Sequence, residues 1–183
     1  YSSKYFWGSN CSGDTMEEVV ISIEETKKLA REIAQTLKAG DVLALYGNLG
    51  TGKTTFANAL ANLFGQNVGF YGQQDLSSQF NTWVSSLVAV FEEVKETDAT
   101  LIKLKAASTA RTVTINAKYQ QPYSFQSFVK IILLSNNEKT FIRANRNDLR
   151  FWVRKLSPLK EYDPNFNENL ESETPAVAFY LST

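Results

Sequence analysis

Apolar residues in this chain gather in short runs that are bounded by polar or turn-forming residues. Three such runs lie at residues 41–46, 86–93 and 128–137. Short apolar runs are typical of strands that are buried on both faces, as in parallel sheets. A segment with apolar side chains at helical spacing and a closing glycine lies between the first two runs, and it contains Phe56, Ala59, Leu60, Leu63 and Gly65. The pattern predicts an α/β fold with three layers around a central, mainly parallel sheet.

A further strand and helix are predicted nearer the start of the chain. Residues 17–23, EEVVISI, have the composition of a strand, and residues 24–40 have the apolar spacing of a helix. Ser22 and Glu25 form a capping box at the start of this helix, and Gly40 ends it.

The sequence GNLGTGKT at residues 47–54 stands between a predicted strand and a predicted helix, and it fits the P-loop pattern. Glycines in such a loop let successive backbone N–H groups converge on phosphates at the helix N-terminus. Lys53 would reach the β- and γ-phosphates of ATP, and Thr54 would offer its hydroxyl to Mg²⁺. The residues predicted to contact the nucleotide are Gly47, Asn48, Leu49, Gly50, Thr51, Gly52, Lys53, Thr54 and Thr55. The alternative is a glycine-rich turn that happens to precede a helix.

The same skeleton occurs once more, as GSNCSGDT at residues 8–15, with Asp14 where the other copy has Lys53. A carboxylate about 4 Å from a phosphate costs on the order of 4 kcal/mol at an effective dielectric constant near 20. We therefore interpret residues 8–15 as an exposed turn and not as a second nucleotide site.

Composition removes several classes of chemistry. The chain has no histidine, which excludes Ser-His-Asp hydrolysis and histidine-containing zinc sites. Its 19 basic and 19 acidic residues balance, so a nucleic-acid surface would have to be a local patch. Cys11 is the single cysteine, and no apolar run approaches the roughly 20 residues of a membrane span, so we expect a cytoplasmic protein without a membrane partner. Because the chain begins with Tyr1, we expect it to be a piece of something longer.

Two carboxylates, Glu92 and Glu93, end the apolar run 86–93. Adjacent acids at a strand tip suit a Walker B element, in which one acid holds the Mg²⁺ shell and the next polarises the attacking water. We assign Glu92 to the metal together with Thr54, and we assign Glu93 to the water. The alternative is a pair of glutamates at the start of a solvated helix.

Residues 16–56 resemble the N-terminal part of the TsaE family, the bacterial ATPases of tRNA threonylcarbamoyladenosine biosynthesis. The matching features are the strand EEVVISI, the helix after it, and DVLALYGNLGTGKTTF. The resemblance implies an ATPase that acts within a tRNA-modifying protein complex. That family usually continues with a Ser-Pro-Thr-Phe switch segment and a strand containing His and Asp, and this chain has neither.

From about residue 52 onward the chain resembles the superfamily 3 helicase module of phage, viral and mobile-element replication proteins. The segment ANALANLFGQNVGFYGQQDLSSQFNTW at residues 57–83 carries this similarity, and KYFWGSNCSG at residues 4–13 resembles the same family's own strand and P-loop start. The chain therefore looks chimeric, like a helicase module into which a foreign P-loop segment has been inserted.

The helicase resemblance implies roles for further residues. The run 128–137 resembles the sensor-1 motif, in which Asn136 would contact the γ-phosphate or the water. The alternative is a turn formed by Ser-Asn-Asn. A later segment resembles the region that supplies an arginine finger to a neighbouring subunit, with Arg150 in the family's position and Arg143 or Arg146 as substitutes.

A stretch without acidic residues runs from Ala99 to Asn137. Its basic residues are Lys103, Lys105, Arg111, Lys118 and Lys130. Within it TVTINA predicts a strand, KYQQPYS a turn and SFVKII a returning strand, which makes a hairpin with Lys118 and Tyr119 at the tip. In the helicase family such a hairpin grips single-stranded DNA, and a cation beside an aromatic ring suits that task. The alternative is a solvated hairpin whose aromatic residues belong to the core.

These observations predict one P-loop NTPase domain, similar to AAA+ and superfamily 3 helicase modules, over residues 1–183. Its parts are a degenerate start at 1–15, a TsaE-like segment at 16–65, a helicase-like core at 66–157, and an acidic closing segment at 158–183 with a helix from about Asn165. The expected function is that of a DNA helicase whose subunits form a hexameric ring and use ATP and Mg²⁺ to move single-stranded DNA. A TsaE-like ATPase, or a nucleotide-binding chimera without motor activity, is the alternative.

Overall fold

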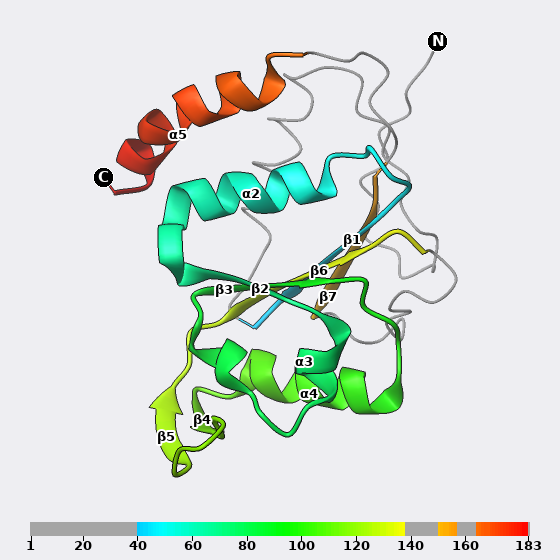
Figure 1. Cartoon of the computed structure of the whole chain (residues 1–183), viewed down its shortest axis with the longest axis vertical. Coiled ribbons are helices and arrows are strands. Elements are labelled where there is room, and N and C mark those ends of the chain that lie inside the picture. The colour runs from blue at the N-terminus through cyan, green and yellow to red at the C-terminus, as the bar shows by residue number, and fades with distance from the viewer. Residues whose placement is uncertain (1–39, 138–149, 157–163, 183) are drawn as a thin grey trace.

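A five-stranded parallel sheet forms the centre of the molecule, which we describe from a computed structural model over residues 40–137, 150–156 and 164–182 (Figure 1). The strand order is β2-β3-β6-β1-β7, and every neighbouring pair is parallel. The strands are β1 (Val42–Tyr46), β2 (Val68–Tyr71), β3 (Val88–Glu92), β6 (Lys130–Ser135) and β7 (Phe151–Lys155). The predicted α/β fold with a mainly parallel central sheet is confirmed.

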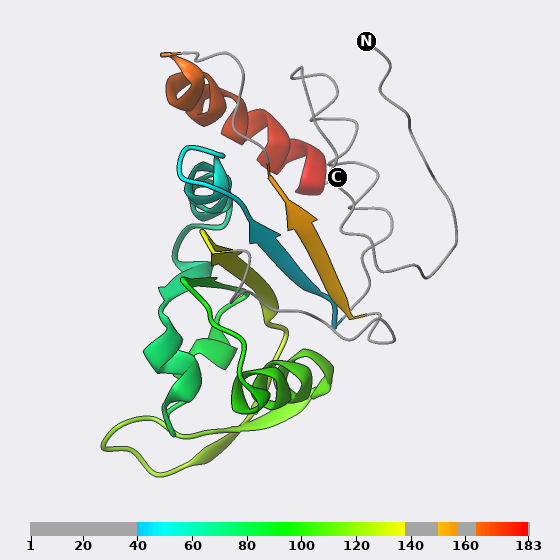
Figure 2. The same cartoon turned by 90° about the vertical axis from the view of Figure 1, so that its right-hand side faces the viewer.

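Helices cover both faces of the sheet, which gives the predicted three layers (Figures 1 and 2). The helices are α2 (Lys53–Phe64), α3 (Gln73–Ser77), α4 (Asp98–Thr109) and α5 (Phe166–Ser182), with short 3-10 turns η1 (Gly65–Asn67) and η2 (Thr82–Ser85). On one face α2 packs on the sheet and α5 contacts α2. On the other face α3, η2 and α4 contribute to a larger buried cluster.

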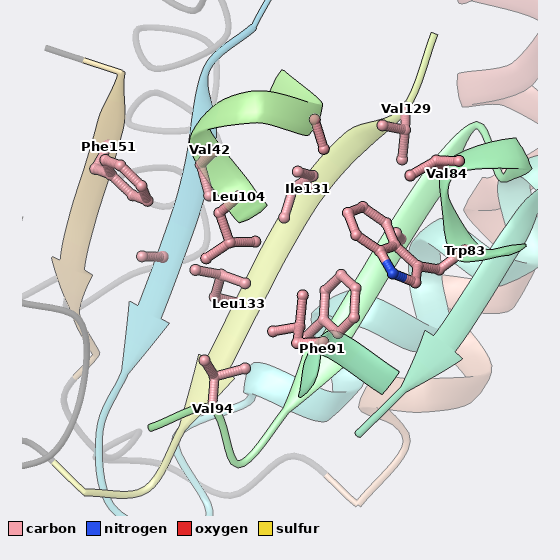
Figure 3. Close-up of a cluster of buried hydrophobic side chains, with 14 of the residues drawn as sticks. Val42, Trp83, Val84, Phe91, Val94, Leu104, Val129, Ile131, Leu133 and Phe151 are labelled. Atoms are coloured by element: carbon pink, nitrogen blue, oxygen red, sulfur yellow. The ribbon is translucent and has the colours of Figure 1, made fainter. Parts of the chain in front are cut away.

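Alternation along β3 shows how the two faces are filled. Val88 and Val90 belong to the cluster beneath α2, whereas Ala89 and Phe91 belong to the cluster that includes α3 and α4. The ring of Trp83 meets that of Phe91 edge-on, with centroids 5.2 Å apart (Figure 3). A strand with apolar side chains on both faces explains why the run 86–93 has no polar alternation.

The predicted helix after the P-loop is confirmed, including its end at Gly65, but its buried face differs from the prediction. Ala57 is fully buried, and Leu60 and Phe64 pack beside it, while Phe56 is exposed. Lys53 and Ala57 are four residues apart and therefore lie on the same face of the helix. Because the Lys53 side chain turns into the loop before the helix, this face is the one that meets the sheet.

The predicted hairpin is also confirmed, with one correction to its second strand. β4 (Thr112–Ile115) pairs antiparallel with β5 (Tyr123–Gln126), so the returning strand begins inside the predicted turn and ends before SFVKII. The Ser127 N–H donates to Arg111 O, which extends the pairing by one residue, and its hydroxyl donates to Val84 O. The chain then enters the central sheet as β6.

Several predicted elements lie outside the described residues. They are the strand and turn of residues 4–15, the strand 17–23, and the helix 24–40 apart from Gly40. The closing helix predicted from about Asn165 is confirmed as α5. Within the described part of the chain, no helix is long and apolar enough to cross a bilayer.

Candidate nucleotide-binding site

Three chain segments meet at the carboxyl edge of the sheet. The register pairs Tyr46 with Ser135 and Glu92 with Leu134, so the ends of β1, β6 and β3 lie side by side. The loop of residues 47–52 follows β1 and leads directly into α2 (Figure 1). This edge, where a loop meets a helix N-terminus, is the position at which parallel α/β folds bind ligands.

The backbone of the loop explains its glycines. Gly50 and Gly52 have φ of 80° and 81°, in the left-handed region that side chains disfavour. Gly47 donates its N–H to Ser135 O at 3.2 Å, and a Cβ at this position would overlap the carbonyl oxygen of Leu156. The loop is therefore held between the ends of β6 and β7, with no room for a side chain at its first residue.

Lys53 occupies the hollow of the loop. Its Nζ donates to Gly47 O at 2.7 Å, to Asn48 O at 2.9 Å and to Thr51 Oγ1 at 2.9 Å. Burial lowers the pKa of the Lys53 ammonium, and attraction to Glu93 raises it by less. The loop itself satisfies the donors of the ammonium in this structure.

The two predicted carboxylates are at the neighbouring strand tip. Glu92 is the last residue of β3, and strand alternation puts it on the face covered by α2. Glu93 follows with φ of 53°, and its Oε1 accepts a hydrogen bond of 2.6 Å from Asn136 Nδ2. The structure thus brings together Lys53, Glu93 and Asn136, which are far apart in the sequence.

The donors at this edge suit magnesium. Thr54 is exposed in the first turn of α2, and Glu92 is exposed at the end of β3. Hydroxyl and carboxylate oxygens are hard ligands, and Mg²⁺ is usually held by one or two carboxylates together with phosphate oxygens. Among the described residues, no three acidic, cysteine or histidine side chains are grouped so that they could hold a metal ion by themselves, without phosphate oxygens.

The candidate arginine finger does not join this edge. Arg150 immediately precedes β7, and its carbonyl accepts from Val42 N at 2.7 Å, so it lies at the amino edge of the parallel sheet. Arg143 and Arg146 lie outside the described residues. Arg154 pairs with Leu45 in the register, near the carboxyl edge, and sequence reasoning did not single it out.

The hairpin tip carries both predicted nucleic-acid residues in the open. Tyr119 is 92% exposed with φ of 63°, and Lys118 Nζ lies 5.0 Å from the centroid of its ring. The hairpin extends beyond α4, on the side of the sheet opposite α2 (Figures 1 and 2). Lys103 from the same basic stretch is instead structural, because its Nζ donates to the carbonyls of Leu76 and Ser78.

Comparison with known sequences gives two kinds of match. A family model described as "Family of unknown function (DUF5906)" matches residues 45–150. A stretch of 49 residues is 55% identical to the tRNA threonylcarbamoyladenosine biosynthesis protein TsaE of Aquifex aeolicus (strain VF5), covering 26% of this chain and 37% of that protein. A stretch of 45 residues is 49% identical to TsaE of Bacillus subtilis (strain 168), covering 25% of this chain and 28% of that protein. The chain thus spans well under half of these relatives, and the predicted TsaE resemblance is confirmed over that short stretch.

Comparison with solved structures finds the fold of the NrS-1 C-terminal region. One apo structure of that region has a TM-score of 0.67 at 22% identity, covering 82% of this chain and 38% of that one. The A form has a TM-score of 0.67 at 24% identity, covering 80% and 37%. A short TsaE match within a domain of NrS-1 fold agrees with the predicted chimeric character. Since the family model covers more than half of the sequence, the chain belongs to the DUF5906 family.

Proposed function

We propose that this domain binds ATP with Mg²⁺ and hydrolyses it to ADP and phosphate. The observation that carries the proposal is the meeting of Lys53, Glu93 and Asn136 beside a glycine loop at one edge of the sheet. Phosphoryl transfer requires little covalent chemistry from a protein, so a cation, a water-positioning group and a metal site in the right places are sufficient.

Each residue has a distinct part in the proposed reaction. The backbone N–H groups of the loop and the Lys53 ammonium would bind the phosphates, and Thr54 and Glu92 would hold the magnesium, whose charge stabilises the phosphate oxygens. Glu93 would polarise a water and accept its proton as the water oxygen bonds to the γ-phosphorus and the bond to the bridging oxygen breaks. Asn136 would keep the Glu93 carboxylate in place through their hydrogen bond.

We further propose that hydrolysis moves single-stranded DNA through a ring of subunits, as the resemblance to superfamily 3 helicases implies. An exposed Tyr119 beside Lys118 supports this, because stacking and phosphate contact are the two contributions that sequence-tolerant binding requires. Arg150 could act only in a neighbour's site, since it lies at the opposite edge of its own sheet. A hexameric ring in the cytoplasm is the assembly we propose.

A second candidate is an ATPase that acts in tRNA modification. The 55% identity to a TsaE protein favours it, although that identity extends over only 49 residues. A TsaE-like enzyme would need a protein partner for full activity and would not respond to DNA. A nucleotide-binding chimera without motor activity would bind ATP and show neither response.

The test begins with ATP binding and turnover by the wild-type chain, Lys53→Ala and Glu93→Gln. Loss of an ammonium near the phosphates removes on the order of 4 kcal/mol, so Lys53→Ala should weaken ATP binding by about a thousandfold. Lys130→Ala is the matched control, because Lys130 is exposed at the amino edge of the sheet. Glu93→Gln should keep ATP affinity and lose turnover by at least about a hundredfold.

The same preparations separate the candidate functions. Turnover that rises with single-stranded DNA, and hexamers that form as concentration increases, support the motor. Turnover that responds only to tRNA-modifying proteins supports the second candidate. Unchanged ATP affinity in Lys53→Ala would remove the site assignment altogether.

A further inference from the structure

The first residue of α3, Gln73, lies beside the turn that carries Glu93. β2 is the neighbour of β3, and the register pairs Tyr71 with Phe91. The chain leaving β2 therefore runs next to the chain leaving β3, at the same carboxyl edge as the P-loop. Gly72 turns the chain into α3, and Asp75 accepts the Gly72 N–H at 2.8 Å, which fixes the start of the helix.

The side-chain amide of Gln73 joins three elements. Its Oε1 accepts a hydrogen bond of 2.9 Å from the backbone N–H of Lys95, two residues after Glu93. Its Nε2 donates to Thr100 Oγ1 at 3.3 Å, in the first turn of α4, and to Ser77 Oγ at 3.4 Å within α3. Of these contacts, the one to Lys95 is the shortest and reaches the turn after β3.

The turn after β3 needs such support because Glu93 has an unfavourable backbone. A non-glycine residue with φ of 53° persists only where its surroundings fix it. Val94 is fully buried and anchors the next residue, while Asn136 holds the Glu93 carboxylate. The Gln73 contact secures the backbone on the far side of the turn, so the strained residue is held from both directions.

We propose that Gln73 is a positioning residue for Glu93, acting through the backbone of Lys95. The proposal rests on the proposed hydrolytic role of Glu93. Without the amide oxygen, the turn relaxes toward negative φ and the carboxylate leaves the place where it can polarise water. ATP binding is unaffected, because the loop and Lys53 are on the other side of β6.

The test compares Gln73→Ala, Gln73→Glu and Ser77→Ala. Gln73→Ala should lower kcat by about tenfold or more and leave the dissociation constant for ATP within about twofold. Gln73→Glu keeps an acceptor for the Lys95 N–H, so it should restore most of kcat. Ser77→Ala removes the longer Nε2 contact and the hydrogen bond of 3.0 Å from the Ser77 hydroxyl to Gln73 O, but it leaves the contact to the Lys95 N–H, so kcat should be unchanged.

Hydrogen exchange at the Lys95 amide gives a readout that does not depend on activity. Exchange should be faster in Gln73→Ala and close to wild type in Gln73→Glu. If Gln73→Ala does not fold, Gln73→Met takes its place in the comparison with Gln73→Glu, because methionine keeps the side-chain volume and lacks the amide oxygen.

Failure of the inference and failure of the proposed function are distinguishable. If the wild type does not hydrolyse ATP, or if Glu93→Gln turns over normally, the proposed function is wrong. If Glu93→Gln is inactive while Gln73→Ala retains kcat, or while Gln73→Glu is as impaired as Gln73→Ala, the positioning role is wrong and the proposed function stands.

Discussion

One substitution at the exposed tyrosine of the hairpin tip should change DNA affinity without changing the free energy of unfolding. Tyr119 has a left-handed backbone and a side chain that is 92% exposed, so it gains little from burial while it carries conformational strain. Strain held at an exposed aromatic residue suggests that its side chain serves binding and not folding. We predict that Tyr119→Gly leaves the free energy of unfolding nearly unchanged and weakens binding to single-stranded DNA.

The magnitudes follow from three opposing contributions to stability. Removing the strain of a left-handed backbone at a residue with a side chain raises the free energy of unfolding by roughly 1–2 kcal/mol. The added backbone freedom of glycine in the unfolded chain costs about 0.5–1 kcal/mol, and loss of the exposed contact between the Lys118 ammonium and the ring costs about 0.5–1 kcal/mol. These nearly cancel. The lost stacking on a base is worth about 1–3 kcal/mol, or roughly 5- to 150-fold in affinity.

The assay measures unfolding in urea and binding of a fluorescent oligothymidine at several salt concentrations. Tyr119→Phe is the matched control, because it keeps the ring and should bind almost as wild type. Lys118→Ala should instead reduce the slope of log affinity against log salt by about one. A loss of more than about 2 kcal/mol in the stability of Tyr119→Gly would show that the ring serves the fold. An unchanged affinity for the oligonucleotide would show that the ring does not contact DNA. Either result would refute the reasoning.

Two further predictions concern the P-loop. Gly47→Ala should lower the free energy of unfolding by about 1–3 kcal/mol, since its Cβ would overlap the Leu156 carbonyl oxygen; thermal unfolding checks this, and a melting temperature equal to wild type would mean that the end of β7 yields. Because burial lowers the pKa of Lys53, the folded chain releases that proton at lower pH than the unfolded chain, so stability should rise with pH in the window just below 10.5. The measurement is the difference in unfolding free energy between wild type and Lys53→Met across that window, and a difference that does not vary with pH would contradict the pKa direction.

Local patterns predicted those parts of the molecule whose structure depends on neighbours in sequence. The strand, glycine loop and helix around Lys53 were predicted because a turn motif fixes its own geometry, and the hairpin was predicted from alternation around Pro122. The helix at Asp98–Thr109 was not predicted, because Lys103 lies on the face that packs against α3 and interrupts the apolar pattern. Lys103 is tolerated there because its ammonium meets the carbonyls of Leu76 and Ser78.

The contacts between distant segments could not be predicted in the same way. Glu93 was expected beside Lys53 because adjacent acids at a strand tip suit a Walker B element, whereas Asn136 was expected there from the resemblance to helicases. No periodicity gives the order of strands in a sheet. The role of Gln73 left no signal in the sequence. A glutamine at a helix start is ordinary, and its contact with Lys95 exists only because β2 lies next to β3.

The middle position of β6 in the sheet has a consequence for how the protein is made. β1 and β3 are not neighbours in the sheet, and each pairs on one side with residues 130–135, which lie between them. On the ribosome, both strands emerge before the one that joins them, so until then β1 has neither of its neighbours and β3 has only β2. A nascent chain that stops before residue 130 therefore cannot bring the ends of β1 and β3 together at the carboxyl edge, however complete its glycine loop already is.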